Sequence, residues 1–483
     1  MRSTLKPTLL EKSRPGAGGK WVSDHDFQDE PVNDLFPDID IRDDDLGLPD
    51  ASEVEVVRHY TELSKRCHGV DNGAYPLGSC TMKYNPKRHD RYAQLDGFAD
   101  VHPHQPQSTM QGVMALLYNL ERHIAELMGV DCVSLQPAAG AHGELVGMLV
   151  LRKYFEDKGE SNRKIILIAD SAHGTNPASA AMAGFDCRII PTTPEGLMDL
   201  NVLQASMSQD VAGLMLTNPS TLGLFDKNIA MISDIVHIKG ALLYYDGANL
   251  NALMGRVRPG DMGFDIVHIN THKTLSTPHG GGGPGAGPVG VKEFLSPYLP
   301  VPIVNRNDDG SYYFDYQVPK SIGRVKSHYG HITVLIRAYA YILAMGPDGL
   351  KKASEDAVLN ANYIQNQLKD ILPPVFDSHC MHECLLSGRD LPVSPFSFAK
   401  RLIDLNLHPP TLVGAGCVYF PEALGNSMLI EPTESETKDS LDLIVSTFRR
   451  VYHEACADAD FVNEAPHAGH SRKIPEFPRV FED

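Results

Sequence analysis

Cysteine is scarce in this sequence: eight residues are scattered over a chain of 483. Proteins that depend on a disulfide framework carry cysteine at far higher density, so the thiols are expected to be reduced. Positive charge is also in deficit, because 43 Lys and Arg face 61 Asp and Glu and the formal net charge is −18. A phosphate backbone is bound by clustered Lys and Arg, so the composition excludes a general nucleic-acid binder.

Long apolar runs are missing as well. No segment approaches the roughly 20 apolar residues that a membrane-spanning helix needs, and the N-terminal residues lack the apolar core of a signal peptide. Hydrophobic residues still make up 42% of the chain and charged residues 22%, which is typical of a folded globular protein. We therefore expect a cytoplasmic protein with a large core, no membrane association and no nucleic-acid partner.

Four regions of different composition follow one another along the chain. Residues 1–95 are rich in Pro, Gly and Asp with one convincing helix at 51–66, which predicts an N-terminal arm that packs on a larger body or on a partner subunit. Residues 96–345 are expected to form a large ligand-binding domain and residues 346–461 a smaller α+β domain. The polar, proline-bearing residues 462–483 are expected to form a C-terminal tail.

Short apolar segments alternate with helical patterns in the large region. The predicted strands lie at 132–135, 164–169, 187–191, 211–217, 241–245, 266–270 and 288–291. The predicted helices lie at 110–128, 142–155, 177–183 and 228–237, with further helices at 350–372 and 394–405 in the small region. Strands that are apolar throughout and alternate with helices indicate an α/β fold with a mostly parallel sheet covered on both faces.

The residues just after these strands are where chemistry is expected, because ligands of such sheets bind beyond the carboxyl ends of the strands. Small residues at 136–142 lead into a helix, so their backbone N–H groups and the positive helix end suit a phosphate. Asp246 follows the predicted strand 241–245, and Lys273 follows the next predicted strand, 266–270. Pyridoxal phosphate needs a lysine for its Schiff base and a carboxylate that keeps its pyridine nitrogen protonated.

The ordered set of residues is more specific than its members. A lone Asp after a strand is more often a turn or helix cap, a lone Lys is usually solvated, and His142 by itself is more often a packing residue. Together with Asp246 and Lys273, however, His142 is placed to face the cofactor ring and Asn249 to bind the ring hydroxyl. The pattern therefore predicts a pyridoxal-phosphate site.

Five long segments closely resemble the P-protein of the glycine cleavage system, a glycine dehydrogenase (decarboxylating) that depends on pyridoxal 5'-phosphate. They lie at 75–86, 136–144, 170–184, 244–255 and 265–291. The resemblance implies the aspartate-aminotransferase-like fold (fold type I), with a large domain around a mostly parallel sheet and a smaller α+β C-terminal domain. Single-chain members are much longer, and this chain is similar to their catalytic second half, which implies the catalytic subunit 2 of the two-subunit form.

The resemblance also implies roles for individual residues. Lys273 is the Schiff-base lysine, Asp246 the partner of the pyridine nitrogen, and His142 the residue that stacks on the ring. Ala139, Gly140 and Ala141, with His272, form the phosphate cradle. Thr175 and Asn176 are further contacts of the cofactor and substrate, Ser79, Cys80 and Thr81 lie near the substrate, and no metal is implied.

The implied reaction is the oxidative decarboxylation of glycine. Carbon dioxide leaves, and the aminomethyl group passes to the lipoyl arm of the H-protein, which is the oxidant. The expected partners are a companion subunit 1, in a two-plus-two heterotetramer, and the lipoylated H-protein. From the site pattern alone, another fold type I enzyme, such as a cysteine desulfurase-like lyase or an amino-acid decarboxylase, or a scaffold without cofactor, stays open.

Two further motifs match other functions less well. Residues 285–290 fit the dinucleotide fingerprint G-x-G-x-x-G, but Pro288 lies inside the motif and a strand, not a helix, is predicted to continue from it. The segment 379–384 contains two His and two Cys, with His408 and Cys417 as further candidates for a zinc site, yet a structural zinc site usually needs a second pair at set spacing. We therefore interpret the first motif as a loop beside Lys273 and the second as a strand with incidental thiols.

Overall fold

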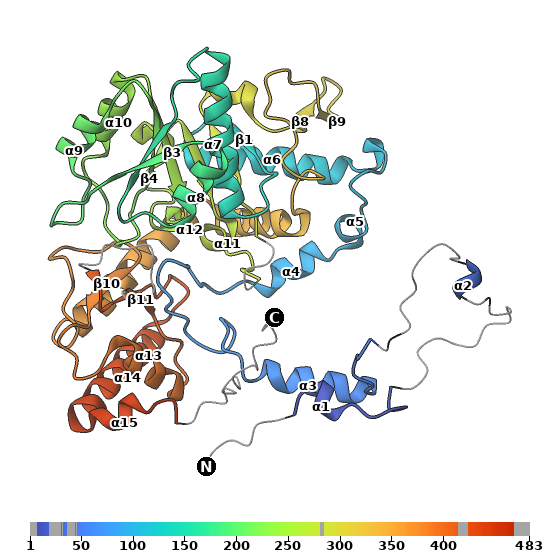
Figure 1. Ribbon diagram of the computed structural model, residues 1–483. Coiled ribbons are helices and arrows are strands. Elements are labelled where there is room, and N and C mark those ends of the chain that lie inside the picture. Colours follow the sequence, from blue (N-terminus) through green and yellow to red (C-terminus); the bar gives the residue numbers. More distant parts are fainter. Residues whose placement is uncertain are drawn as a thin grey trace. The chain divides into compact units, whose positions relative to one another are not determined.

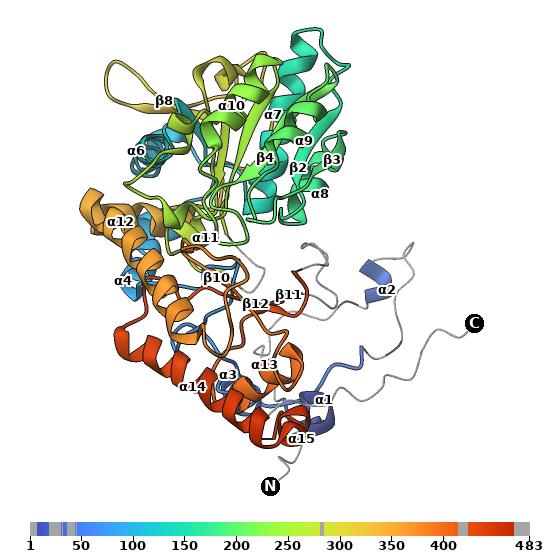
Figure 2. The same cartoon turned by 90° about the vertical axis from the view of Figure 1, so that its left-hand side faces the viewer.

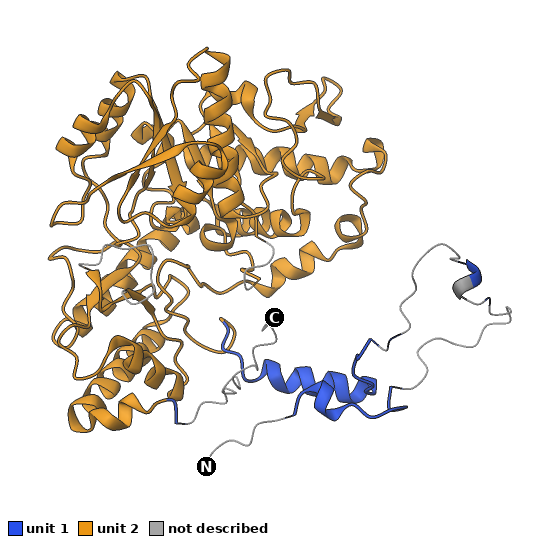
Figure 3. Cartoon of the chain, viewed as in Figure 1, with its two compact units in different colours: residues 1–69, 466–483 blue, residues 70–465 orange. Residues whose placement is uncertain are grey.

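The computed structural model describes residues 7–18, 30, 32–35, 44, 46–280, 285–413 and 424–467. The chain divides into two units, one made of residues 1–69 and 466–483 and the other of residues 70–465 (Figure 3). No helix in the described part of the chain is both long enough and apolar enough to cross a membrane.

The smaller unit contains three helices within its described residues: α1 (Leu9–Lys12), α2 (Val32–Leu35) and α3 (Glu53–Ser64). α3 confirms the helix predicted at 51–66. Ser52 and Glu55 form a capping box at its start, in which each side chain binds the other residue's backbone N–H. Arg14 reaches Glu55 at 2.5 Å and so joins the first turn of α3 to the segment that follows α1.

The larger unit is built on a seven-stranded sheet with the order β1-β7-β6-β5-β4-β2-β3. All seven predicted strands are present: β1 (Cys132–Ser134), β2 (Ile165–Ala169), β3 (Asp186–Ile190), β4 (Val211–Thr217), β5 (Leu242–Gly247), β6 (Ile266–Ile269) and β7 (Val289–Val291). Strands β3, β2, β4, β5 and β6 are parallel, whereas β7 runs antiparallel to both β6 and β1. The sheet is mostly parallel, as predicted.

Helices cover both faces of this sheet (Figures 1 and 2). Side chains alternate along β5, so that Leu242 and Tyr244 pack in one hydrophobic core and Leu243 and Tyr245 in the other. The first core includes α7 (Gly140–Asp157) and α8 (Thr175–Met182); the second includes α6 (Gln111–Met128), α9 (Leu200–Ser206) and α10 (Ile229–Ile238). Burial on both faces explains why these strands are apolar throughout.

Short elements surround the sheet. They are α4 (Lys87–Ala93), α5 (Asp96–Ala99), α11 (Thr271–Thr274), the 3₁₀ helices η1 (Gln107–Thr109), η2 (Leu250–Ala252), η3 (Pro259–Met262) and η4 (Glu293–Tyr298), and the strand pair β8 (Ile303–Arg306) and β9 (Tyr312–Asp315). α12 (Ile332–Leu368) connects the large sheet to the C-terminal region. The sequence predicted this helix only from 350, because Gly346 and Pro347 interrupt the helical pattern; the backbone kinks at Gly346 and the helix resumes.

The C-terminal region contains a second, antiparallel sheet with the order β10-β12-β11. Its strands are β10 (Cys384–Ser387), β11 (Thr411–Val413) and β12 (Ser427–Ile430), and its helices are α13 (Pro395–Asp404), α14 (Lys438–Ala457) and α15 (Ala459–Asn463). Ser394 caps α13 and Pro395 opens it, as predicted. The domain limits at 345 and 461 stay a prediction: the first falls beside the kink in α12 and the second inside α15.

Candidate active site

A cavity of about 290 Å³ lies at the carboxyl ends of β4, β5 and β6. Parallel strands that end at one edge of a sheet bring the residues after them together there, as the sequence analysis assumed. The cavity is lined by most of the predicted site residues: Ser79, Cys80, Ala139, Gly140, Ala141, Thr175, Asp246, Asn249, His272 and Lys273.

Lys273 lies on α11, directly after β6, and is 9% exposed. Its Nζ donates a hydrogen bond to the carbonyl oxygen of Ser79 at 2.8 Å. These two residues are far apart in the sequence, so the loop around Ser79 forms a wall of the site that the sheet itself does not supply.

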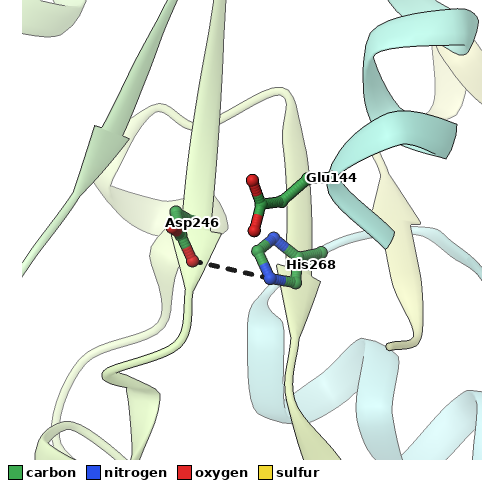
Figure 4. Close-up of side chains that lie close together, drawn as sticks. All are labelled: Glu144, Asp246 and His268. Carbon is green, nitrogen blue, oxygen red and sulfur yellow. Dashed lines mark ion pairs between the residues drawn. The ribbon is translucent and has the colours of Figure 1, made fainter. Parts of the chain in front are cut away.

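Asp246 ends β5 and is 2% exposed. Its Oδ2 accepts a hydrogen bond from Asn176 Nδ2 at 2.9 Å, its Oδ1 accepts one from the Ala248 N–H at 3.0 Å, and His268 Nε2 lies 3.5 Å away (Figure 4). Burial alone raises the pKa of Asp246, but His268 and the N–H donors outweigh it, so the pKa lies below its ordinary value. Asp246 is therefore an anion inside the cavity.

Glu144, on α7, is a second buried carboxyl close to Asp246 (Figure 4). It accepts hydrogen bonds from Thr175 Oγ1 at 2.8 Å and from Asn176 Nδ2 at 2.9 Å. Burial and the charge of Asp246 raise the pKa of Glu144 to about 8. Glu144, Asp246 and His268 have donor atoms within 4.8 Å of one another, as metal ligands do, but the proton held on Glu144 lets the two carboxyls lie together without an ion.

The start of α7 forms the floor of the predicted phosphate cradle. Ala139 is the N-cap and provides no side-chain cap, so the first N–H groups and the positive end of the helix dipole suit an anion. A Cβ on Gly140 would lie 2.2 Å from Asn270 Oδ1, which requires glycine at this position. His272 also lines the cavity, and burial lowers its pKa to about 3, so its imidazole is neutral.

The cavity fits pyridoxal phosphate by the chemistry of its donors and acceptors. It combines an anionic carboxylate, an amine on Lys273 and a helix start without a side-chain cap. Two buried polar atoms in its lining, Thr217 Oγ1 and His272 Nδ1, have no hydrogen-bond partner among the described residues. Buried polar atoms are rarely left unpaired, so these two are candidates to bind polar groups of a ligand.

Three predicted site residues do not line the cavity. His142 Nδ1 accepts the N–H of Ala138 at 3.1 Å, so this ring supports the turn before α7. Asn176 lies behind the cavity wall and donates to both Asp246 and Glu144. Thr81 is buried against Glu431.

No role was predicted for several other lining residues: Glu144, His173, Thr217, Thr221, Ala248, Asn270 and His279. Thr217 ends β4 and Asn270 follows β6, so the strand-end rule already pointed to both. His173 belongs to the segment 170–184 quoted for the family resemblance, and its Nδ1 lies 2.9 Å from Thr175 Oγ1. Glu144 belongs to the quoted segment 136–144, but the strand-end pattern did not point to it, and an acidic residue in the second turn of a helix is usually exposed.

Gly285, at the start of the first motif, lines the same cavity as Lys273, as interpreted, whereas the second motif is not a strand, because residues 379–383 precede β10, which begins at Cys384. β7, not a helix, continues from the G-x-G-x-x-G match. In the zinc candidate, Cys380, His382 and Cys384 are buried and His379 is exposed, while His408 stacks on Tyr75 with ring centroids 3.7 Å apart. Within the described residues, His382 instead groups with Glu383 and Glu431; Cys417 lies outside those residues.

Comparisons with known proteins converge on one family. Residues 93–394 match the family model for the glycine cleavage system P-protein, and residues 353–467 match the model for the glycine dehydrogenase C-terminal domain. A Caldanaerobacter subterraneus subsp. tengcongensis protein named probable glycine dehydrogenase (decarboxylating) subunit 2 is 51% identical over 97% of this chain and 96% of its own length. A protein of the same name from Listeria innocua is 50% identical over the same shares.

Solved structures show the same fold. A glycine decarboxylase (P-protein) of the glycine cleavage system in inhibitor-bound form is similar with a TM-score of 0.71 at 20% identity, over 87% of this chain and 93% of that one. A cysteine desulfurase from Thermococcus onnurineus is similar with a TM-score of 0.62 at 14% identity, over 79% of this chain and 95% of that one. The predicted fold type I architecture is confirmed.

Proposed function

Because the chain belongs to the glycine cleavage system P-protein family, we propose that it is the catalytic subunit of a glycine dehydrogenase that removes the carboxylate of glycine as carbon dioxide. The cavity in which Lys273, Asp246 and the start of α7 meet is the observation that carries this function. Identity over nearly the full length favours it over the other fold type I enzymes and over the cofactor-free scaffold that the sequence left open.

Pyridoxal 5'-phosphate is the cofactor that these residues suit. When bound, it supplies an electron sink for the charge left on the glycine α-carbon as the carboxylate leaves. Lys273 would attach the cofactor covalently, and Asp246 would bind its ring nitrogen. The cofactor phosphate would be bound by Ala139, Gly140 and Ala141, with His272. Thr175 and Asn249 complete the binding set, and Asn176 acts through Asp246.

The chain's own groups divide the proton chemistry. Asp246, as an anion, would accept a hydrogen bond from the protonated ring nitrogen and so keep the proton on that nitrogen, while Asn176 and Ala248 fix the two carboxylate oxygens. Glu144 keeps its own proton at neutral pH and so does not compete as a second anion. Ser79 and Cys80 line the cavity beside Lys273, whose amine donates to the Ser79 carbonyl.

His173 is a better candidate than His142 for the residue that faces the cofactor ring. It lines the cavity, whereas His142 binds the backbone of Ala138. Burial lowers the pKa of His173, so its imidazole is neutral and suited to stacking on an aromatic ring.

The acceptor and the partners follow from the family. The name subunit 2, carried by the relatives, implies a companion subunit 1. We assign the chain to a heterotetramer of two plus two subunits. The oxidant in this assignment is the lipoyl disulfide of the H-protein. One lipoyl sulfur takes the aminomethyl group, the other becomes a thiol, and the S–S bond breaks.

The function is tested by Lys273→Ala in the reconstituted enzyme with its companion subunit and H-protein. We expect loss of both glycine–bicarbonate exchange and the visible absorbance of covalently attached cofactor. Lys320→Ala, an exposed lysine paired with Asp157, serves as control and keeps both. Exchange activity, or covalently held cofactor, in the Lys273→Ala protein would refute the assignment.

A further inference from the structure

The wall that holds Lys273 is joined to the small sheet. Leu77 forms a bridge to Ile430 of β12, and the Gly78 N–H donates to the Leu429 carbonyl at 3.2 Å. Thr411 Oγ1, from β11, donates to the Gly78 carbonyl at 2.7 Å. A Cβ on Gly78 would lie 2.4 Å from the Leu429 side chain, so glycine is required for this close approach. The segment before Ser79 therefore extends the small sheet.

Two buried carboxyls meet at the end of that sheet. β10 and β12 are antiparallel with Cys384 opposite Ile430, so the residue before β10, Glu383, and the residue after β12, Glu431, become neighbours. Both are 0% exposed. Residues from two strands far apart in sequence thus place two carboxyls side by side without solvent.

Each carboxyl binds the loop of residues 79–81. Glu383 Oε2 accepts the Ser79 N–H at 2.6 Å. Glu431 Oε2 accepts the Thr81 N–H at 2.9 Å, and its Oε1 accepts the Thr81 hydroxyl. We call Glu383 and Glu431 the carboxyl clamp.

The clamp holds a backbone conformation that the loop would not adopt alone. Ser79 has φ +65° and Thr81 has φ +40°, both in the left-handed region. For a β-branched residue such as Thr81 this region is especially unfavourable, and such conformations persist where the surroundings fix them. Hydrogen bonds to both carboxyls supply that fixation on either side of Cys80.

We propose that Glu383 and Glu431 are positioning residues for Lys273: by fixing loop 79–81 they present the Ser79 carbonyl as the acceptor that holds the lysine amine once the glycine amine has replaced it on the cofactor. The inference rests on the proposed function. Its geometric basis is the 2.8 Å hydrogen bond from Lys273 Nζ to Ser79, whose own N–H is bound by Glu383. An amine with a fixed acceptor returns to the same place after each turnover.

The electrostatic setting supports this arrangement. Burial raises the pKa of both Glu383 and Glu431, and the charge of Lys273 acts in the opposite direction on each. His382 lies beside the pair, with Nε2 at 3.5 Å from Glu383 and 3.9 Å from Glu431. These three side chains also have ligand atoms within 4.8 Å of one another, so a bound metal ion is the competing account.

The test compares Glu383→Met and Glu431→Met, which remove the acceptor oxygens at similar side-chain length, with Glu436→Met; Glu436 is partly buried and accepts a hydrogen bond from Ser440. Each enzyme is reconstituted with cofactor and companion subunit, and glycine is added while the visible spectrum of the bound cofactor is recorded. We expect the two clamp variants to need about 10-fold more glycine for half of the spectral change, because an interaction made after displacement is lost. Glu436→Met keeps the wild-type value.

A second pair of variants covers the case in which a clamp variant fails to fold. Thr81→Val removes the hydroxyl that binds Glu431 and keeps the β-branched shape, whereas Thr81→Ser keeps the hydroxyl. We expect the glycine requirement to rise in Thr81→Val and to return towards wild type in Thr81→Ser. Equal requirements in both Thr81 variants and in folded clamp variants would overturn the proposal.

The metal content of the purified enzyme distinguishes the carboxyl clamp from a metal site. One equivalent of a divalent ion per wild-type chain, lost in Glu383→Met and Glu431→Met, would replace the carboxyl clamp by a metal site; wild-type enzyme free of such an ion supports the clamp. A wild-type enzyme that neither binds cofactor covalently nor exchanges bicarbonate refutes the proposed function itself. Wild-type exchange together with unchanged clamp variants refutes only the clamp.

Discussion

The site has two walls of different origin, one from the large parallel sheet and one from the small antiparallel sheet. Asp246 and Lys273 come from the first: Asp246 lies at the end of β5, and Lys273 lies on α11, just after β6. Loop 79–81 forms the second and is fixed by Glu383 and Glu431, which flank β10 and β12. The first wall carries the groups that bind the cofactor, and the second decides where the lysine rests. Chemistry and positioning are thus assigned to different sheets.

The largest effect is expected on the wall from the large sheet. Asp246→Asn removes the anion that holds the proton at the ring nitrogen, and we expect glycine–bicarbonate exchange to fall by about 10²–10³-fold. Asp226→Asn is the matched control, because Asp226 is also buried but binds the backbone of Met198 and Asn228 outside the cavity lining. A loss of exchange smaller than that of the clamp variants would contradict the division between the two walls.

An intermediate effect distinguishes two histidines. His173→Ala removes a ring from the cavity lining, and we expect the cofactor dissociation constant to rise about 10-fold, the size of a lost aromatic contact. His142→Ala removes only the acceptor of the Ala138 N–H, and we expect it to change the cofactor dissociation constant by less than about 3-fold. Equilibrium dialysis of the cofactor measures the dissociation constants of both variants. A larger effect of His142→Ala than of His173→Ala would show that His142 faces the cofactor ring.

The smallest effect concerns stability and pH. The pKa of Glu144 is raised to about 8 in the folded chain, so the folded state holds a proton that the unfolded state releases at lower pH. The stabilising contribution of that proton is complete below the ordinary Glu value of about 4.5 and is lost as the pH rises towards 8. In Glu144→Gln no such proton can be lost, so the variant avoids a decrease in the free energy of unfolding of at most roughly 1.4 kcal/mol for each pH unit.

Melting temperatures between pH 5 and pH 8 test this sign. The melting temperature of Glu144→Gln should rise by a few degrees relative to that of the wild type as the pH rises from 5 to 8. Glu156→Gln, an exposed residue on the same helix that pairs with Arg152, should show no such trend. A Glu144→Gln curve parallel to wild type over this range would show that Glu144 is already ionised in the folded chain.

The wall from the large sheet was predictable because its residues follow strands directly. A strand that is apolar throughout marks its own end, and parallel strands bring their ends to one edge, so Asp246 and Lys273 were expected to meet. Glu144 and His173 were not assigned, although both lie in the quoted segments. Which way a helix or loop turns its side chains depends on packing across the sheet, which periodicity does not report.

The wall from the small sheet was predicted only through the family resemblance, and its support was missed. The resemblance placed Ser79, Cys80 and Thr81 beside the substrate, but Glu383 and Glu431 carried no signal. Glu383 lies in the segment 379–384, which was considered as a zinc site on the basis of its His and Cys residues, and the glutamate was given no role. The register that pairs Cys384 with Ile430 is what brings the two carboxyls together.

The sequence by itself determined the α/β class, the strands of the large sheet, the family, and the lysine and carboxylate of the site. These depend on local patterns: apolar runs, the residues that end them, and long motifs. Tertiary structure alone decided that His173 rather than His142 lines the cavity, which of two adjacent carboxyls keeps its proton, and what holds loop 79–81. Each of these depends on burial and on distances between segments remote in sequence, and desolvation and charge–charge interactions exist only once those segments have packed together.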